Sequence, residues 1–230
     1  MQEFDSSVEG GKRDGKENKE LYSGQFERMT EHIYRLTFPF VFSKLWPFYT
    51  VPVACFLVHD PNTSRYSLID VGPQNCNVEV VNALCKFFDR DYEISKKKID
   101  NEQAYKALNK IDHVCLTHFH NGHCWGLNSI YELSKKEMKI FLHEKELSYV
   151  REGKKFNEQE SESSIFSFSK HFFKNPKLGL PCESYDGIMN DYSHKDEPRH
   201  CLCYCHCPGH TEGHSCFYHE EDRALICGGL

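Results

Sequence analysis

The segment from Thr117 to His123 reads Thr-His-Phe-His-Asn-Gly-His, so it places three histidines within six residues. It continues from residues 113–117, an apolar run that predicts a buried strand. Histidines two residues apart in a non-helical turn can direct two imidazoles at one ion, and a third histidine three residues further on can face a neighbouring site. Zinc favours imidazole nitrogen as a ligand. The spacing therefore predicts a metal site on a loop at the end of a strand.

A second histidine motif lies near the other end of the chain, at Cys207-Pro-Gly-His210-Thr-Glu-Gly-His214-Ser. Proline and glycine favour a turn, and residues 200–207 and 215–219 predict a strand on either side. His210 is therefore expected to project from a loop at the edge of a sheet. The chain has 14 histidines, so one alone carries little weight. Three in six residues together with this turn favour a metal site over chance clustering.

The remaining pattern predicts a layered domain. Apolar runs predict strands at residues 33–40, 51–59, 66–70, 113–117, 138–143, 200–207, 215–219 and 224–227. Helical spacing predicts helices at residues 78–88, 102–109, 127–133 and 144–151. In the last helix, Glu144 and Glu146 would lie in the first turn, where the helix dipole favours acidic residues. This order of elements predicts an α/β or α+β layered fold, in one domain over residues 32–230.

Two polar segments stand apart from this domain. Residues 1–24 are rich in Lys, Glu, Asp and Gly and cannot bury an apolar face, so we predict a disordered tail. Residues 153–198 are polar and irregular, and structureless connections of this length are uncommon in compact domains. We interpret them as a variable insertion, which is either a lid over a site or a disordered segment.

The composition bounds the partners and the location. The net charge of −6 argues against a broad grip on nucleic acid, and no DNA partner is predicted. The short basic runs at residues 96–98 and 135–136 leave room for an RNA substrate as an alternative to a small molecule. No apolar run is long enough to span a membrane, and the N-terminus lacks the apolar core of a signal peptide. We therefore expect a cytoplasmic protein with no membrane partner.

The 12 cysteines allow two interpretations. A disulfide framework requires an oxidising compartment, whereas the lack of a secretion signal favours reduced thiols. Cys201, Cys203, Cys205 and Cys207 alternate along a predicted strand and would share one face. Adjacent members would lie roughly 6.5–7 Å apart, too far for most of them to converge on one ion, so buried residues on a core face are the favoured account. Cys124, beside the histidine cluster, is a candidate soft metal ligand.

Four motifs resemble those of the metallo-β-lactamase superfamily. His118-x-His120-x-x-His123 resembles the signature His-x-His-x-Asp-His, and residues 67–72, with Asp70 and Gly72, resemble the first motif. Residues 208–215 resemble the third motif, and residues 225–230 resemble the fourth, which normally ends in Gly-Asp. Their order and spacing agree, and the opening strands are most similar to the branch with RNA-cleaving and thioesterase-like members. The resemblance implies an αββα sandwich that is incomplete at the C-terminus.

The resemblance also implies the ligands of a first metal. Three histidines would hold it, namely His118, His120 and His210. Asp70 would support the ligand loop by hydrogen bonds without touching the metal. His214 would be a structural residue.

The implied second metal site is degenerate. Of its four ligands only His123 is present. Gly122 takes the place of the signature Asp, Gly229 takes the place of the bridging Asp, and the C-terminal His would lie beyond Leu230. One zinc site is therefore expected, and a second zinc is doubtful.

The function implied by the resemblance is zinc-dependent hydrolysis, in which metal-bound hydroxide attacks an ester, thioester, amide or phosphodiester. Because Gly122 and Gly229 carry no carboxylate, we expect the activity to be impaired, with His123 as a second-site remnant or proton carrier. The alternatives are a non-catalytic metal-binding or interaction protein, and a fragment of a longer enzyme. The substrate depends on loops and is not fixed by the fold.

Overall fold

The computed structural model of the chain describes residues 24–41, 50–73, 77–94, 98–152, 178–185 and 201–229. The predicted disordered tail lies outside these residues except for Gly24, and so does most of the predicted insertion. The two segments named as a tail and a lid therefore stay predictions.

The larger sheet provides the edges on which the functional residues lie. Its strands run side by side as β1 (Glu27–Arg28), β2 (Ile33–Val41), β3 (Thr50–Asp60), β4 (Arg65–Ile69), β5 (Ile111–Cys115), β6 (Lys139–Leu142) and β7 (Cys182–Ser184). Neighbours from β1 to β4 are antiparallel, and neighbours from β4 to β7 are parallel. The carboxyl ends of β4 and β5 therefore share one edge of the sheet, and their amino ends share the opposite edge.

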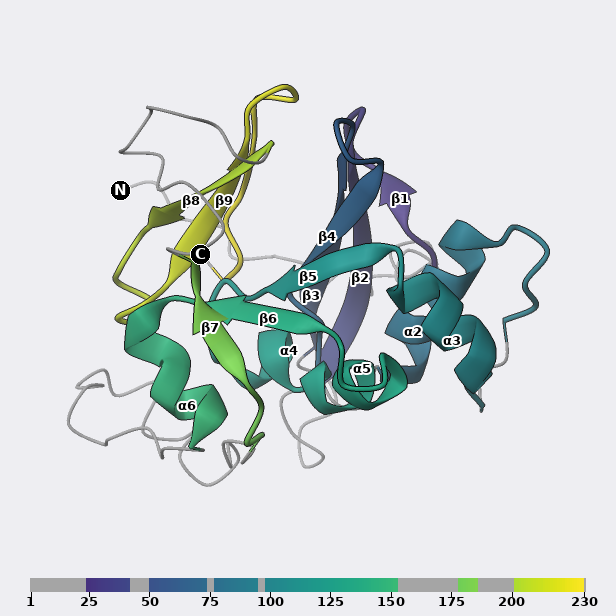
Figure 1. The fold of residues 1–230 in the computed structure, drawn as a ribbon. Coiled ribbons are helices and arrows are strands. Elements are labelled where there is room, and N and C mark those ends of the chain that lie inside the picture. Colours follow the sequence, from purple (N-terminus) through teal and green to yellow (C-terminus); the bar gives the residue numbers. More distant parts are fainter. Residues whose placement is uncertain are drawn as a thin grey trace, which may run out of the picture.

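Helices cover one face of this sheet (Figure 1). They are α2 (Asn77–Phe88), α3 (Asn101–Leu108) and α5 (Leu127–Leu133), and the short α4 (Asn121–Cys124) precedes α5. Leu84 of α2, Leu108 of α3 and Ile130 of α5 are buried in one cluster with Leu57 and Leu68 of the sheet. Burial of these aliphatic side chains is the main force that holds the helices on the sheet.

A second sheet packs on the opposite face and contains β8 (Leu202–His206), β9 (Ser215–His219) and β10 (Ala224–Ile226). All its pairings are antiparallel. Ile69 of β4 and Phe141 of β6 meet Tyr204 and Phe217 of the small sheet in a second buried cluster. Leu68 and Ile69 thus enter different cores, as expected from the alternation of side chains along a strand. The described residues form layers of helices, large sheet and small sheet, which confirms the predicted α/β layered class.

The structure corrects the prediction of one helix over residues 144–151. A 3₁₀ turn, η2 (Glu144–Glu146), precedes a short helix, α6 (Leu147–Arg151). Glu146 is fully buried, so it does not serve as an exposed acidic residue of a first helical turn. The strand β7 was not predicted either, because only three residues of a polar segment pair with β6.

Of the four alternating cysteines that were predicted to be buried on a core face, Cys203 is buried and Cys201 packs against the core between the sheets. Leu202 and Tyr204 are the members of this strand that enter the core between the sheets. Cys203 therefore points to the opposite face of the small sheet. The alternation was predicted correctly, but both faces of this strand carry residues that can be buried.

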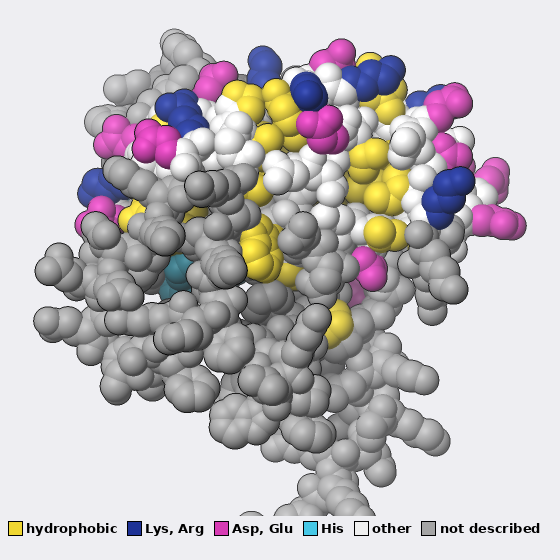
Figure 2. All heavy atoms as spheres, turned by 90° about the horizontal axis from the view of Figure 1, so that it is seen from below, with side chains coloured by type: hydrophobic (Ala, Val, Ile, Leu, Met, Phe, Trp, Pro, Cys, Tyr) yellow, Lys and Arg dark blue, Asp and Glu magenta, His cyan; other side chains and the backbone are white. Residues whose placement is uncertain are grey.

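None of the described helices combines the length and the apolar character that crossing a bilayer requires. On the face seen in Figure 2, the Lys and Arg side chains of the described residues stand among Asp and Glu side chains, with hydrophobic side chains exposed between them. The described residues of this face therefore form no large surface of one charge.

Candidate metal centre

The histidine loop leaves the carboxyl end of β5 and is held by the loop that leaves the carboxyl end of β4. Asp70 N–H donates to the carbonyl oxygen of Cys115 (2.9 Å), and Val71 N–H donates to that of His123 (2.8 Å). These hydrogen bonds position both ends of the histidine loop. The two parallel strands therefore set its location at this edge of the sheet.

The second histidine motif reaches the same place from the small sheet. It forms the loop between β8 and β9, and Ser215 N–H at the start of β9 donates to the carbonyl oxygen of Thr117 (2.9 Å). That bond brings the loop against the histidine segment, so His210 lies beside residues that are about 90 positions earlier in the chain.

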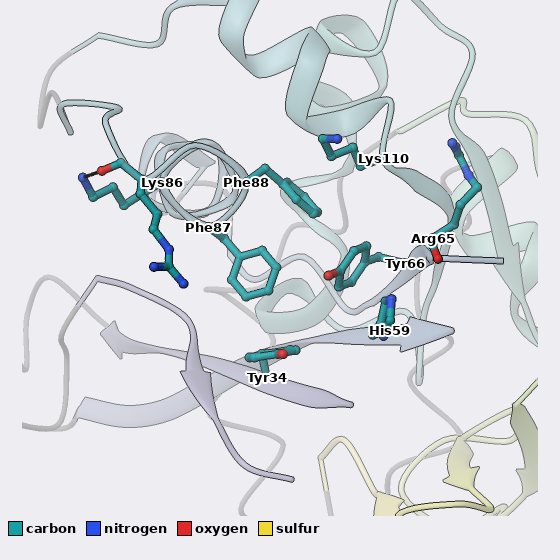
Figure 3. A pocket seen from close by; sticks show the side chains of 10 residues that line it. Tyr34, His59, Arg65, Tyr66, Lys86, Phe87, Phe88 and Lys110 are labelled. Atoms are coloured by element: carbon teal, nitrogen blue, oxygen red, sulfur yellow. Dashed lines mark hydrogen bonds between the residues drawn. The ribbon is translucent and has the colours of Figure 1, made fainter. Parts of the chain in front are cut away.

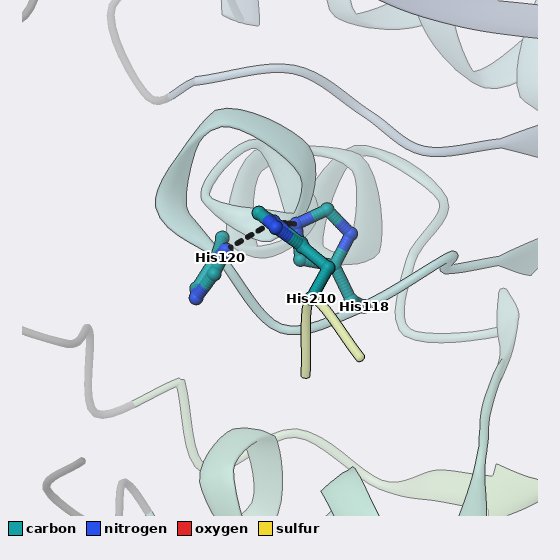
Figure 4. A group of neighbouring side chains, drawn as sticks. All are labelled: His118, His120 and His210. Atoms are coloured by element: carbon teal, nitrogen blue, oxygen red, sulfur yellow. Dashed lines mark hydrogen bonds between the residues drawn. The ribbon is translucent and has the colours of Figure 1, made fainter. Parts of the chain in front are cut away.

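Three imidazoles converge there, from His118, His120 and His210 (Figure 4). His210 Nε2 is 3.2 Å from His118 Nε2 and 2.9 Å from His120 Nδ1. Tetrahedral nitrogen ligands 2.0–2.1 Å from a zinc ion lie roughly 3.3 Å from one another. The spacing of the three nitrogens is close to that of a shared ion, so these residues fit a metal as a ligand set.

The environment keeps these imidazoles neutral. Burial is the largest cause that lowers the pKa of His118 well below its usual value, and the neighbouring histidines lower it further. Burial and the neighbouring His210 lower the pKa of His120 to about 3. The pKa of His210 is lowered in the same direction, again mainly by burial. Only a neutral imidazole can offer a lone pair to a metal, so the site presents its ligands in the required protonation state.

Asp70 supports this arrangement without being one of the three converging residues. Its carboxylate is buried and accepts hydrogen bonds from Thr117 N–H, from the Thr117 hydroxyl and from His123 Nδ1, each at 2.8 Å. Because the Thr117 hydroxyl donates to Asp70, it accepts from His118 Nδ1 at 2.9 Å. This chain of bonds leaves His118 Nε2 with its lone pair turned toward the other histidines.

His123 and His214 stand beside the group. The ring centroid of His123 is 4.2 Å from that of His118, and its Nδ1 lies 2.8 Å from the Asp70 carboxylate. His214 is buried, and its Nδ1 lies 3.3 Å from the carbonyl oxygen of Cys207. Cys124 donates its thiol proton to the carbonyl oxygen of Phe119 and is not part of the converging group.

Glu146 is the residue of this region that sequence reasoning missed. Its side chain accepts hydrogen bonds from Phe119 N–H (2.7 Å), Gly213 N–H (3.1 Å) and the Thr211 hydroxyl. One carboxylate thus joins the two loops that carry the histidines. Burial raises the pKa of Glu146 to about 7, although these hydrogen bonds oppose the shift. A Cβ at Gly213 would lie 2.4 Å from the Glu146 Cγ, so glycine is required for this approach.

The two glycines at the second-metal positions have different surroundings. A Cβ at Gly229 would lie 3.0 Å from both His118 Cε1 and His210 Nε2, so a side chain there would point at the histidine group. A Cβ at Gly122 would lie 3.5 Å from a methyl group of Val53, which is ordinary contact. Position 229 is therefore adjacent to the site, and neither glycine contributes a ligand atom.

A second group with metal-like spacing lies where β2 begins near the β9–β10 hairpin, and it contains His32, His219 and Asp222. The Asp222 carboxylate already accepts from the Thr30 hydroxyl, from His32 N–H (2.9 Å) and from His32 Nδ1 (2.8 Å). Because these hydrogen bonds occupy its oxygens, we interpret the group as a structural connection between the large sheet and the small sheet.

Comparisons with known proteins agree with the fold and the motifs. The model of the metallo-beta-lactamase superfamily matches residues 51–228. The curated protein "Probable metallo-hydrolase YybB" of Bacillus subtilis (strain 168) is 27% identical over 130 residues, which are 56% of this chain and 49% of that protein. This chain therefore spans about half the length of that relative.

Two solved structures share the fold at low sequence identity. One is MEM-A1, a subclass B3 metallo-beta-lactamase from a soil metagenome library, with a TM-score of 0.53 and 11% identity over 84% of this chain and 56% of that chain. The other is a metallo-beta-lactamase of Cronobacter sakazakii, with a TM-score of 0.52 and 11% identity over 84% of this chain and 58% of that chain. The protein belongs to the metallo-beta-lactamase superfamily. Within it, the chain is similar to metallo-hydrolases.

Proposed function

We propose that the chain is a zinc-binding metallo-hydrolase with one metal site, formed by His118, His120 and His210, and with weak activity toward an ester, thioester, amide or phosphodiester. The observation that carries the proposal is the convergence of three neutral imidazole nitrogens, 2.9 and 3.2 Å apart, at the edge of the sheet. A bound zinc would supply a Lewis acid and lower the pKa of a water molecule toward neutrality.

The chain's own residues would orient the site and carry protons. Asp70 holds the tautomers of His118, through Thr117, and of His123. His123 is proposed as a proton carrier next to the histidine group, since its ring centroid is 4.2 Å from that of His118. Glu146 holds the backbone of the histidine loop at Phe119 and is proposed as a positioning residue, since it accepts hydrogen bonds from Phe119 N–H, the Thr211 hydroxyl and Gly213 N–H.

The proposed weakness of the activity follows from Gly122 and Gly229. At both positions a carboxylate would have offered a ligand oxygen or a proton acceptor, and glycine offers neither. His123 alone cannot hold a second ion tightly, because stable zinc sites use three or four protein ligands.

Zinc stoichiometry tests the site directly. We expect about one zinc per chain in the purified protein and none at this site in the double variant His118→Ala/His210→Ala. His59→Gln removes a distant imidazole and serves as the matched control that retains zinc. Two tightly bound zincs that are both lost in the double variant would contradict the single-site proposal.

The second candidate function is a metal-binding or interaction protein without catalysis, and the missing carboxylates at positions 122 and 229 favour it. A panel of chromogenic thioester and phosphodiester substrates separates the two. Hydrolysis by zinc-loaded protein that disappears in His118→Ala/His210→Ala supports the hydrolase. Equal hydrolysis rates for the wild type and the double variant would favour a metal-binding protein without catalytic activity.

The partners and the location belong to the same proposal. We propose a small-molecule substrate, with RNA as the alternative, and no DNA or membrane partner. We also propose a cytoplasmic location, which is supported by Cys115 and Cys216, because these buried cysteines form no disulfide within the described part of the chain. Because the chain covers about half of its curated relative, the activity of the whole protein stays a proposal.

A further inference from the structure

A cavity of about 720 Å³ lies at the edge of the large sheet opposite the histidine group. Arg65 and Tyr66 line it at the amino end of β4, and Lys110 lines it just before the amino end of β5. The histidine loop leaves the carboxyl ends of the same parallel strands. The cavity is therefore a separate site, and its volume is within the range of small-molecule pockets, about 300–1,000 Å³.

Its inner wall is aromatic. Tyr34, Tyr66, Phe87 and Phe88 line it, and each is only partly buried although it packs on the main core. Their rings meet edge to face, with centroids 4.7 Å apart for Tyr34 and Phe87 and 5.0 Å apart for Tyr66 and Phe88. Partly exposed aromatic rings that gather around one opening are a surface on which a planar ring can stack.

Its rim is cationic. Lys86, Arg90, Lys110 and Arg65 line it, and no acidic residue does so among the described residues. Figure 3 shows Lys86 at one end of the aromatic wall and Lys110 and Arg65 at the other.

Most of these charges lack a carboxylate partner. Arg65 pairs with Asp112, but no ion pair joins Lys86, Arg90 or Lys110 to any residue of the described part of the chain. Lys86 is held near the opening by the carbonyl oxygens of Arg90 and Tyr92. Three cations around one cavity, without an ion-pair partner among the described residues, are unexpected in a chain with a net charge of −6, and they favour an anionic ligand.

We propose that this cavity binds a small ligand that joins a planar aromatic ring to a phosphate, of the nucleoside monophosphate class. The ring would stack on Phe87, Phe88 and the two tyrosines, as nucleobases do on aromatic side chains. The phosphate would accept hydrogen bonds from Lys110 or from Lys86 and Arg90, because such bonds between charged groups are the stronger ones. The site is independent of the proposed metal centre.

Calorimetric titration of the full chain with adenosine monophosphate tests the proposal. We expect binding that is at least about tenfold tighter than that of adenosine or of inorganic phosphate, since each probe lacks one of the two recognised parts. Lys110→Gln and Arg90→Gln should each weaken binding by about tenfold. Lys106→Gln removes an exposed cation outside the cavity and should leave binding unchanged.

The outcomes are distinguishable from those for the metal centre. Binding that persists in His118→Ala/His210→Ala and weakens in Lys110→Gln supports the proposal, and it does so whether or not the chain hydrolyses anything. No heat of binding at millimolar nucleotide overturns it. Equal affinity for phosphate and nucleotide, loss of binding in the double histidine variant alone, or equal weakening by Lys106→Gln also overturns it. If Phe88→Leu retains the fold by circular dichroism, it should reduce the preference for nucleotide over phosphate.

Discussion

The two edges of the parallel strands β4 and β5 carry different kinds of site. At the carboxyl edge, Asp70 and Glu146 are buried and fully engaged in hydrogen bonds that join three loops. At the amino edge, Arg90 and Lys110 are exposed and have no acidic partner among the described residues. The buried hydrogen bonds at the carboxyl edge contribute to the free energy of unfolding of the domain. The exposed charges at the amino edge are available to a ligand. Substitutions at the two edges should therefore separate stability from binding.

The largest effect is expected for Asp70→Asn. Asparagine tolerates the left-handed backbone at this position (φ 57°), but its amide group would face donors from Thr117 or His123. We expect the free energy of unfolding to fall by about 2–3 kcal/mol. Zinc affinity should fall by about 10–100-fold because the histidine tautomers are no longer held. Urea denaturation and zinc titration measure the two effects.

The control for that variant is Asp112→Asn at the amino edge, where the Arg65 pair is exposed and should contribute less than about 1 kcal/mol. Equal destabilisation by both substitutions would break the contrast between the two edges.

The next largest loss of stability is expected for Glu146→Gln. The glutamine amide must oppose either Phe119 N–H or the donors at residues 211 and 213, so the free energy of unfolding should fall by about 1–3 kcal/mol. Glu144→Gln changes an exposed carboxylate two residues away and should have little effect. A variant as stable as the wild type would show that Glu146 does not hold the loops together.

The same variant has a pH signature. The pKa of Glu146 is raised from 4.5 to about 7 in the folded protein, mainly by burial. The folded state therefore binds the proton more tightly than the unfolded state, and the contribution of this group to stability is lost as the pH rises through about 7. The stability difference between wild type and Glu146→Gln should shrink from about pH 5 to about pH 8. A difference that grows would show that the carboxylate is ionised in the fold throughout.

The double variant Gly122→Asp/Gly229→Asp tests the carboxyl edge through its zinc affinity rather than through the stability of the domain. We expect tighter binding of a second zinc, because position 229 faces the histidine group. Gly229→Ala is the matched control, since it adds a methyl group 3.0 Å from His118 and His210 without a ligand oxygen. If the double variant gains no affinity, these glycines do not occupy the ligand positions that the motifs assign to them.

The smallest effect on stability is expected at the amino edge. Lys110→Gln removes an exposed charge with no acidic partner among the described residues, so the free energy of unfolding should change by less than about 0.5 kcal/mol. Thermal unfolding checks this. A larger loss would mean that Lys110 supports the fold, with its ammonium 6.0 Å from the Phe88 ring, rather than serving a ligand.

Much of the fold was predictable because its signals are local. The strands β2, β3, β4 and β5 follow apolar runs, and α5 covers the residues that its spacing predicts. The strand β7 was missed because its three residues pair only after β6 is in place. The core face of β8 was not fixed by periodicity, since alternation defines two faces but not which one is buried.

The candidate site likewise contains residues that local motifs predict and one residue that they do not. His118 and His120 are neighbours in sequence, and His210 is marked by its turn, so a local motif was enough to find the group that converges. The sequence around Glu146 predicted only an acidic residue in the first turn of a helix. Its true partners lie 27 and 65–67 residues away, and no local pattern records them.

The three bonds of Glu146 also set the order in which the site can form. They join segments that are far apart along the chain, and such long-range contacts form late because closing large loops costs entropy first. The hydrogen bonds of Glu146 with Thr211 and Gly213 can form only when the β8–β9 loop has docked beside the histidine loop. Zinc binding measured during refolding would then report the docking of the β8–β9 loop. We expect it to rise after the secondary structure has formed.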